Sequence, residues 1–139
     1  MNIEIRTFEA GDHAEAYAMW ESMDGVGLSS ADSFEKVASF LRRNPGLSFV
    51  GLAEGHVVAT ILCGHDGRRG LIHHLAVAQH VRRKGLGKLL VERALASLHG
   101  EGIEKCHLLV FNDNVEGRAF WRGIGAEERT TLGVFSLQT

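Results

Sequence analysis

The sequence of 139 residues predicts a mixed α/β fold, in which a largely antiparallel sheet carries helices on both faces. Two observations lead to this prediction. Short runs of β-forming residues alternate with segments whose apolar residues recur at helical spacing, and Gly, Asn or Asp marks most of the boundaries. With 45% hydrophobic residues, one Pro and no low-complexity run, the whole chain, residues 1–139, is expected to form a single domain.

The first third of the chain predicts one strand and a pair of helices. Apolar and polar residues alternate over residues 2–7, which indicates a strand with one buried face. Helical spacing of apolar residues follows from about residue 10 to residue 23. Ser30 or Asp32 is suited to begin a second helix, and the Asn-Pro-Gly turn at 44–46 ends it.

The middle of the chain predicts three strands joined by tight turns. Residues 47–54 and 56–64 are rich in β-formers and meet at a Glu-Gly turn, which favours a hairpin. An Asp-Gly turn within residues 65–70 leads to residues 71–78, a run apolar enough for a central strand. Strands joined by such short turns pair antiparallel, so the sheet is expected to grow by neighbours.

The last part of the chain alternates helices and strands. Leu and Ala recur at helical spacing from residue 86 to residue 98, until two glycines end this strongest helix of the sequence. A strand is expected over residues 105–111, a short helix over 115–124 and a final strand over 129–137. The expected order of elements is therefore βααβββαβαβ.

Charge and cysteine content exclude several classes of protein. A formal net charge of -2 argues against a general nucleic-acid or membrane-surface binder, although Arg82, Arg83 and Lys84 form a local positive cluster. Cys63 and Cys106 lie in apolar runs without CxxC spacing, so we expect buried thiols and no metal site. No stretch is typical of a signal peptide or a membrane span, so we expect a cytoplasmic protein.

The segment Arg82–Lys88, between the central strand and the long helix, has the composition of an anion-binding loop. Gly85 and Gly87 let the backbone approach a ligand closely, and free N–H groups at a helix start attract a negative charge. Leu89 follows the lysine where a Walker loop needs Ser or Thr, and Leu90 stands where a dinucleotide fingerprint needs Gly. A pyrophosphate or polyphosphate ligand is expected, held in neither of those two ways.

This loop resembles the signature of the GNAT N-acetyltransferase superfamily. The signature, [QR]xxGxG/A at the head of a helix, is matched by Arg82, Gly85 and Gly87, directly after the strand that contains residues 74–77. The order of elements expected above is also that of the family. The resemblance therefore implies the family's fold, a central, mostly antiparallel sheet with helices on both faces.

A second signature extends the resemblance over nearly the whole chain. It is an Asn followed seven residues later by an aromatic residue and eleven later by Gly, matched by Asn114, Trp121 and Gly125. The resemblance implies an acetyl-CoA-dependent N-acetyltransferase, which moves an acetyl group to a primary amine of an unidentified small molecule, peptide or protein.

The resemblance also implies which residues bind acetyl-CoA. The pyrophosphate would lie on the backbone amides of residues 83–88, and the pantetheine arm would pair like an added strand with Leu75 and Val77. The Leu75 amide would polarise the thioester carbonyl. The full set implied for acetyl-CoA is Leu75, Ala76, Val77, Arg82, Arg83, Lys84, Gly85, Leu86, Gly87, Lys88, Asn112 and Asn114, with no metal.

His73 is the candidate general base. An amine must be neutral to attack a thioester, and a lysine-like amine with a pKa of about 10.4 is almost fully protonated at pH 7. Family members that use a base often carry Glu or His at positions matching Leu71 and His73, and only His73 can accept a proton here. Strand alternation predicts that His73 shares a face with Leu75, while His74 packs against a helix on the opposite face. A purely structural His73, filling a polar pocket, is the alternative.

Trp121 stands where many family members carry a Tyr that protonates the departing thiolate. Indole is no comparable acid, so solvent or another residue would protonate the CoA sulfur, or the thiolate would leave unassisted. Trp121 is then expected to form a wall of the thioester pocket. Together with Leu71, it keeps open the alternative of a non-catalytic acyl-CoA-binding regulatory domain.

The sequence does not specify the acceptor amine. By the resemblance, selectivity comes from the first two helices and their link, where Glu21 and Asp24 could attract a cationic amine. Arg68 and Arg69 could equally favour an acidic acceptor. The resemblance also allows a homodimer, whereas neither nucleic acid nor membrane is an expected partner.

Overall fold

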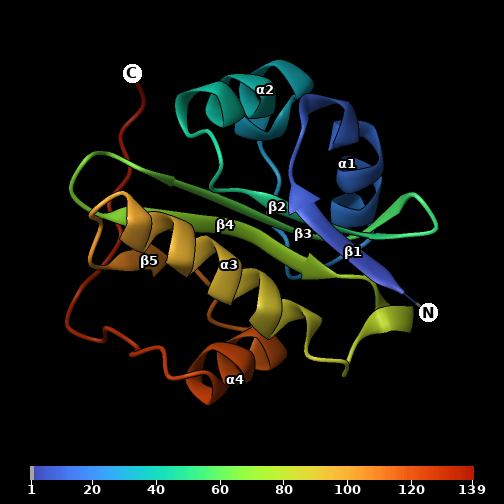
Figure 1. Cartoon of the computed structure of the whole chain (residues 1–139). Coiled ribbons are helices and arrows are strands. Elements are labelled where there is room, and N and C mark those ends of the chain that lie inside the picture. The colour runs from blue at the N-terminus through green and yellow to red at the C-terminus, as the bar shows by residue number, and fades with distance from the viewer. Residues whose placement is uncertain (1) are drawn as a thin grey trace. The chain divides into compact units, whose positions relative to one another are not determined.

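The computed structural model describes residues 2–139 (Figure 1). The chain divides into two compact units, the first ending at Leu109 and the second spanning Val110–Thr139. No helix among the described residues is both long and apolar enough to cross a bilayer. The elements are β1 (Ile3–Thr7), η1 (Ala10–Asp12), α1 (His13–Glu21), η2 (Ser30–Asp32), α2 (Phe34–Arg43), β2 (Phe49–Ala53), β3 (His56–His65), β4 (Gly70–Val77), η3 (Gln79–Val81), α3 (Leu86–Gly100), β5 (Cys106–Leu108) and α4 (Val115–Gly123).

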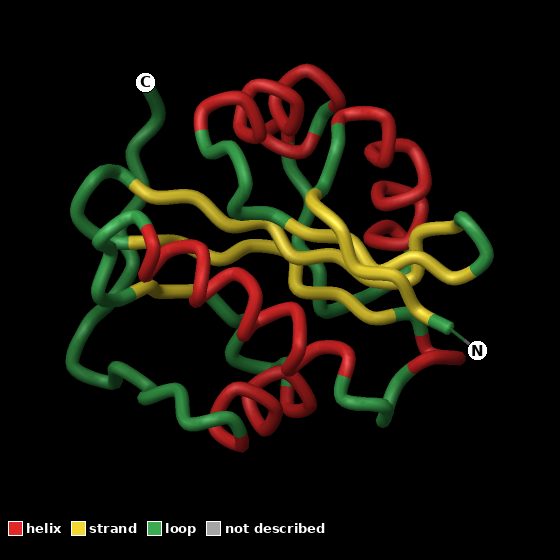
Figure 2. The backbone as a smooth tube through the Cα atoms, in the orientation of Figure 1, coloured by secondary structure: helices red, strands yellow, loops and turns green. Residues whose placement is uncertain are grey.

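The sheet is mixed and mostly antiparallel, as predicted. Its five strands follow the chain order, β1-β2-β3-β4-β5, and run side by side in Figure 2. The first four strands pair antiparallel with one another. Only β5, which follows the crossover through α3, pairs parallel with β4. All five strands belong to the larger unit.

Helices cover both faces of this sheet, which confirms the predicted layers (Figure 1). On one face α1 and α2 bury Trp20 and Val37 against Val50 and Leu52 of β2. On the other face α3 packs against the sheet, where a Cβ atom added to Gly51 would lie 3.6 Å from Leu86. The apolar residues that α3 buries are Leu86, Leu90, Val91, Ala94 and Leu98.

A bulge interrupts β4 in the middle of the sheet. Between two paired positions β4 advances three residues, from His73 to Ala76, while β3 goes back two, from Leu62 to Thr60. β4 therefore has one residue more than β3 in this stretch. Within the bulge, the backbone of His74 is left-handed, with φ of +48°. The buried Thr60 hydroxyl donates to the His74 carbonyl at 2.8 Å, which anchors the bulge.

The predicted final strand over residues 129–137 is wrong. No strand occurs in the described chain after β5, and the side chains of Val134 and Phe135 are 69% and 97% exposed. Residues with a high β propensity form a strand only when a neighbouring strand accepts their hydrogen bonds and one face is covered. The strand predicted over 105–111 is shortened to β5 for the same reason, since β4 pairs with only three of its residues.

Local predictions about the start of the second helix and about one cysteine also need correction. The second helix begins at Phe34, and its cap is Ser33, whose hydroxyl accepts from the Lys36 N–H at 3.2 Å. Asp32, predicted as a cap, is buried and bonded elsewhere. Cys63 is fully buried as predicted, whereas Cys106 is only partly buried.

Candidate functional site

The loop between β4 and α3 is shaped by two left-handed residues. Arg83 and Gly85 have φ of +66° and +77°, and Gly85 is the N-cap of α3 without any side-chain cap. The Arg82 Nε donates to the Val77 carbonyl at 2.8 Å, which fastens the loop to the end of β4. The loop therefore has a defined backbone, and its turn at Gly85 requires a conformation that glycine adopts without strain.

This loop presents a row of free amides. Within residues 2–139, none of the backbone N–H groups from Arg83 to Lys88 donates to a protein acceptor. They lie at the positive end of a helix of 15 residues, and the side chains of Arg82, Arg83 and Lys84 around them are exposed. Amides and cations in this arrangement suit a pyrophosphate, and the binding of one at this loop stays a prediction.

The second half of β4 has one uncovered edge within the larger unit. β5 pairs only with Gly70–Ile72, so β4 has no partner on that side beyond Ile72. The Ala78 N–H donates to Val58 of β3, and alternation then turns the N–H and C=O groups of Val77 and Leu75 toward the uncovered edge. Ala76 pairs with Thr60 and is buried in the core. An extended ligand can pair with this edge as an added strand.

The bulge overturns the predicted faces of the two histidines. His73 pairs with the core residue Leu62, and its ring lies edge-on to Phe40 of α2, 5.9 Å between centroids. His74 therefore lies on the same side, 6.3 Å from His73 between ring centroids, and packs on Trp20 of α1 as expected. Simple alternation failed because the left-handed residue adds one position to the strand.

The surroundings of His73 favour its neutral form. Burial lowers the pKa of His73 below its usual 6.5, the charge of His74 lowers it further, and Asp32 opposes both. No protein group among residues 2–139 bonds either ring nitrogen of His73, and neither nitrogen is sealed from solvent. A partly buried imidazole with free nitrogens and a low pKa is suited to accept a proton near neutral pH.

His74 belongs to a polar cluster that sequence reasoning missed. Its Nε2 lies 2.6 Å from Oδ1 of Asp32, and both side chains are largely buried. His13 of α1 lies 2.8 Å, through Nε2, from the Asp32 carbonyl oxygen. The pattern Ser29-x-x-Asp32 signals a helix cap, and the cap exists, but only the fold reveals a partner 42 residues away.

The three predicted site residues of the smaller unit have local contacts of their own. Asn114 is the N-cap of α4, and its Oδ1 accepts from the Gly117 N–H at 2.9 Å, which leaves the Nδ2 hydrogens as donors. The Asn112 carbonyl accepts from Arg118 at 3.1 Å. Trp121 packs edge-on against Phe120. Their contacts with acetyl-CoA stay predictions.

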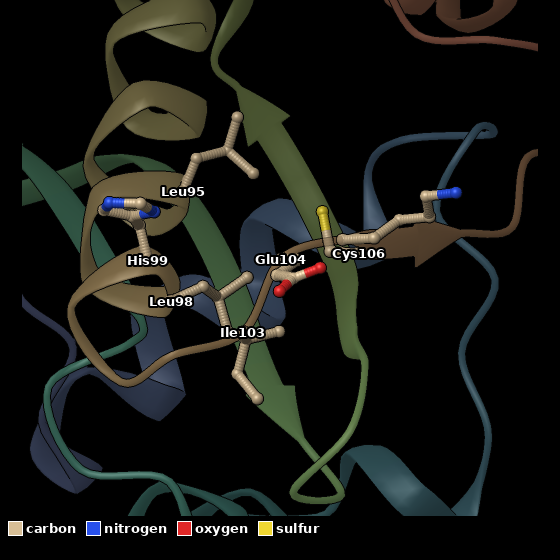
Figure 3. Close-up of a pocket in the computed structure, with 7 residues that line it drawn as sticks. Leu95, Leu98, His99, Ile103, Glu104 and Cys106 are labelled. Carbon is tan, nitrogen blue, oxygen red and sulfur yellow. The ribbon is translucent and has the colours of Figure 1, made fainter.

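A shallow hollow of about 260 Å³ lies elsewhere (Figure 3). Leu95, Leu98 and His99 of α3 line it together with Ile103 and Cys106, so it is at the opposite end of α3 from the amide row. None of the predicted site residues lines it. The hollow is therefore not the candidate site.

Comparison with known proteins identifies the family. The sequence pattern described as the acetyltransferase (GNAT) family matches residues 10–126. An acetyltransferase of Photorhabdus laumondii is 33% identical over 112 residues, which cover 81% of this chain and 78% of the relative.

Two solved structures share the fold. Ard1 from Thermoplasma volcanium has a TM-score of 0.77 at 23% identity, covering 90% of this chain and 82% of Ard1. The paiA N-acetyltransferase from Thermoplasma acidophilum, solved in complex with coenzyme A, has a TM-score of 0.71 at 20% identity, covering 90% and 89%. With the fold shared and the family pattern matched over most of its length, the chain belongs to the acetyltransferase (GNAT) family.

Proposed function

We propose that this acetyltransferase moves the acetyl group of acetyl-CoA to a primary amine of a small molecule, a peptide or a protein. The observation that carries the proposal is the row of unpartnered amides at the start of α3, next in sequence to the uncovered edge of β4. A polyphosphate with a strand-like arm suits these two features together. The coenzyme A bound to the similar T. acidophilum enzyme supports the same ligand class.

Each part of acetyl-CoA has proposed partners in this chain. The amides from Arg83 to Lys88 hold the pyrophosphate, and the backbone of Leu75 and Val77 pairs with pantetheine. The Leu75 N–H polarises the thioester carbonyl as a single oxyanion donor. From the smaller unit, Asn112 and Asn114 donate to the pantetheine arm, and Trp121 forms a wall of the thioester pocket.

His73 is the proposed base of the reaction. Its neutral imidazole takes a proton from the amine, directly or through water, as the amine nitrogen bonds to the thioester carbon. The carbon–sulfur bond then breaks, and the electron pair leaves with the CoA sulfur. Because Trp121 offers no acidic proton, solvent protonates that thiolate, whose pKa near 8.5 makes it a competent leaving group.

Three coarser proposals accompany the activity. Residues 1–139 act as one catalytic domain, because the family pattern spans both compact units. The enzyme works in the cytoplasm, since both described cysteines are free thiols and disulfides are rare in reducing compartments. A homodimer is compatible with this activity but is not required by it.

The test is thiol release from acetyl-CoA across small amines, amino acids, polyamines and peptide N-termini. Turnover with one acceptor class is the expected result and names the substrate. Binding of acetyl-CoA with no turnover on any amine would instead favour the non-catalytic acyl-CoA-binding domain. Cys63 does not compete for the thiol reagent, because burial raises its pKa to about 12. A Cys106→Ser variant removes the other protein thiol from the signal.

The amide row has its own test in acetyl-CoA binding, measured by calorimetry. Gly87→Glu places a carboxylate among the amides and is expected to weaken binding at least about tenfold through charge repulsion. Gly11→Glu makes the same charge change in η1, where an added Cβ meets nothing within 4 Å, and is the matched control. Equal affinity in the two variants would contradict the proposed phosphate site.

A further inference from the structure

We propose that Asp32 and His74 form a positioning pair for this reaction. Asp32 holds the His74 ring, and His74 in turn fixes the bulge that places His73 and the Leu75 amide. This inference rests on the proposed function, in which His73 is the base. Neither member of the pair is assigned a bond to the substrate.

Asp32 is held by β4, by α1 and by the N-cap of its own short helix η2. Its Oδ1 lies 2.6 Å from Nε2 of His74 in β4, and its Oδ2 accepts from the Ser29 N–H at 2.9 Å. Its backbone carbonyl lies 2.8 Å from Nε2 of His13 in α1. The Asp32 and His74 side chains are only 11% and 13% exposed, so the pair is shielded from water that would otherwise loosen it. The link between α1 and α2 is thereby tied to the bulge.

The contact with the carboxylate sets the role of one nitrogen of His74. A carboxylate oxygen accepts, so Nε2 of His74 is the donor whether the ring is neutral or charged, and its Nδ1 points away from Asp32. No protein group among residues 2–139 bonds that Nδ1, and it is not sealed from solvent. The ring is further held by Trp20, 4.7 Å away between centroids. Its orientation is therefore set on two sides.

The bulge itself needs such support. The φ of +48° at His74 lies in a region that residues other than Gly, Asn and Asp rarely adopt, so the surroundings must hold it there. The ring is held by Asp32, and the carbonyl is held by the Thr60 hydroxyl at 2.8 Å. The next residue is Leu75, whose N–H faces the uncovered edge. A shift of the bulge would therefore move the donor proposed to polarise the thioester.

His74 also controls the charge near His73. Among the described residues, the titratable groups that act on His73 are His74 from the same strand and Asp32 from η2. The other elements against the ring present apolar groups, Phe40 from α2 and Leu62 from β3. The charge on His74 lowers the pKa of His73, which keeps the base unprotonated at lower pH.

Two substitutions of His74 separate its support of the bulge from its electrostatic effect on His73. In His74→Gln the amide side chain is long enough to reach Asp32, but it cannot carry the positive charge of the imidazole. In His74→Asn the side chain is too short to reach Asp32, yet Asn tolerates the left-handed backbone. The readouts are the His73 pKa from an NMR titration of its Cε1–H, assigned by its absence in His73→Ala, and the pH profile of kcat/KM.

The expected results differ between the variants. His74→Gln raises the His73 pKa, and the acidic limb of kcat/KM, by at least about half a pH unit, with kcat on the alkaline plateau little changed. His74→Asn shifts the acidic limb of the kcat/KM profile in the same way. It also lowers kcat about tenfold, because the bulge is no longer held. Acetyl-CoA affinity is retained in His74→Gln, in which the bulge is still held. A merely structural role would lower the melting temperature without moving the pH profile.

Opposite results would overturn the inference. An unchanged His73 pKa in His74→Gln contradicts the electrostatic role, and an unchanged kcat in His74→Asn contradicts the positioning role. Should His74→Asn fail to fold, Asp32→Ala replaces it, since it removes the oxygen that accepts from Nε2 of His74. If the wild type acetylates no amine, the proposed function fails, and the NMR titration still decides whether His74 acts on His73.

Discussion

The two halves of β4 differ in how their edges are covered. Gly70–Ile72 pairs with β3 on one side and β5 on the other, so its backbone is fully used within the sheet. Beyond Ile72 the strand bulges at His74 and pairs with β3 alone. The first half is thus held by strands on both edges, whereas the second half has backbone groups, among them the N–H groups of Leu75 and Val77, that face no neighbouring strand.

This difference shows how one strand supplies both stability and chemistry. The covered half tolerates only side chains that fit between α3 and β5, as the close approach at Gly70 illustrates. The uncovered half keeps its geometry through side chains, with Thr60 and Asp32 bonding the bulge. Substitutions in the first half should therefore affect folding, and those in the second should affect binding and turnover.

The largest effect is expected at His73. His73→Ala should lower kcat/KM about 10²- to 10⁴-fold, which is about 3–5 kcal/mol of transition-state stabilisation. A base works only when neutral, so wild-type activity should fall as the pH drops through the His73 pKa. That limb lies below pH 6.5, because burial and the His74 charge lower the pKa, and it should vanish in the variant.

Leu71→Ala is the matched control for His73. Leu71 lies two residues earlier, in the covered half, and its side chain is 37% exposed and cannot titrate. Steady-state kinetics of this variant should stay within about threefold of wild type with the acidic limb intact. Equal losses in the two variants would show that His73 merely packs.

The second largest effect is expected where the bulge is anchored. Thr60→Val keeps the shape of the fully buried side chain but leaves the Trp20 indole N–H and the His74 carbonyl without their partner. Two unsatisfied buried groups should cost about 2–4 kcal/mol in the free energy of unfolding, measured with urea. Thr7→Val at an exposed position should change it by less than about 0.5 kcal/mol. A stable Thr60→Val would mean that the bulge holds without this anchor.

The sequence predicts the features that depend on local interactions and misses those that depend on residues far apart in the chain. The long helix and the amide row depend on local periodicity and two glycines, and both were found. The bulge depends on how β4 pairs with β3, which neither His73 nor His74 signals by itself. Asp32 was read as a helix cap because its true partner lies 42 residues away. The tail at 129–137 has β-forming residues but no described strand to pair with.

A smaller effect is expected at Gly70 in the covered half. A Cβ atom there would lie 2.8 Å from Leu98 and 3.0 Å from Cys106, so Gly70→Ala overpacks the contact between α3 and β5. We expect a loss of about 1–2 kcal/mol in the free energy of unfolding, with kcat per folded molecule unchanged. Gly11→Ala, where nothing lies within 4 Å, is the control. A fall in kcat at full stability would contradict the division of β4 into two halves.

The smallest effect is expected at Val77, where the backbone itself can be tested. Val77→Pro removes the N–H that faces the uncovered edge, and it breaks no ladder bond because β3 does not use that group. If pantetheine pairs there, acetyl-CoA affinity should fall about three- to tenfold, the worth of one hydrogen bond. Val77→Ala also replaces the valine side chain but keeps the N–H, so its affinity should stay near wild type. Equal affinities by calorimetry would mean that the cofactor does not pair with this edge, and the uncovered half of β4 would then need another ligand.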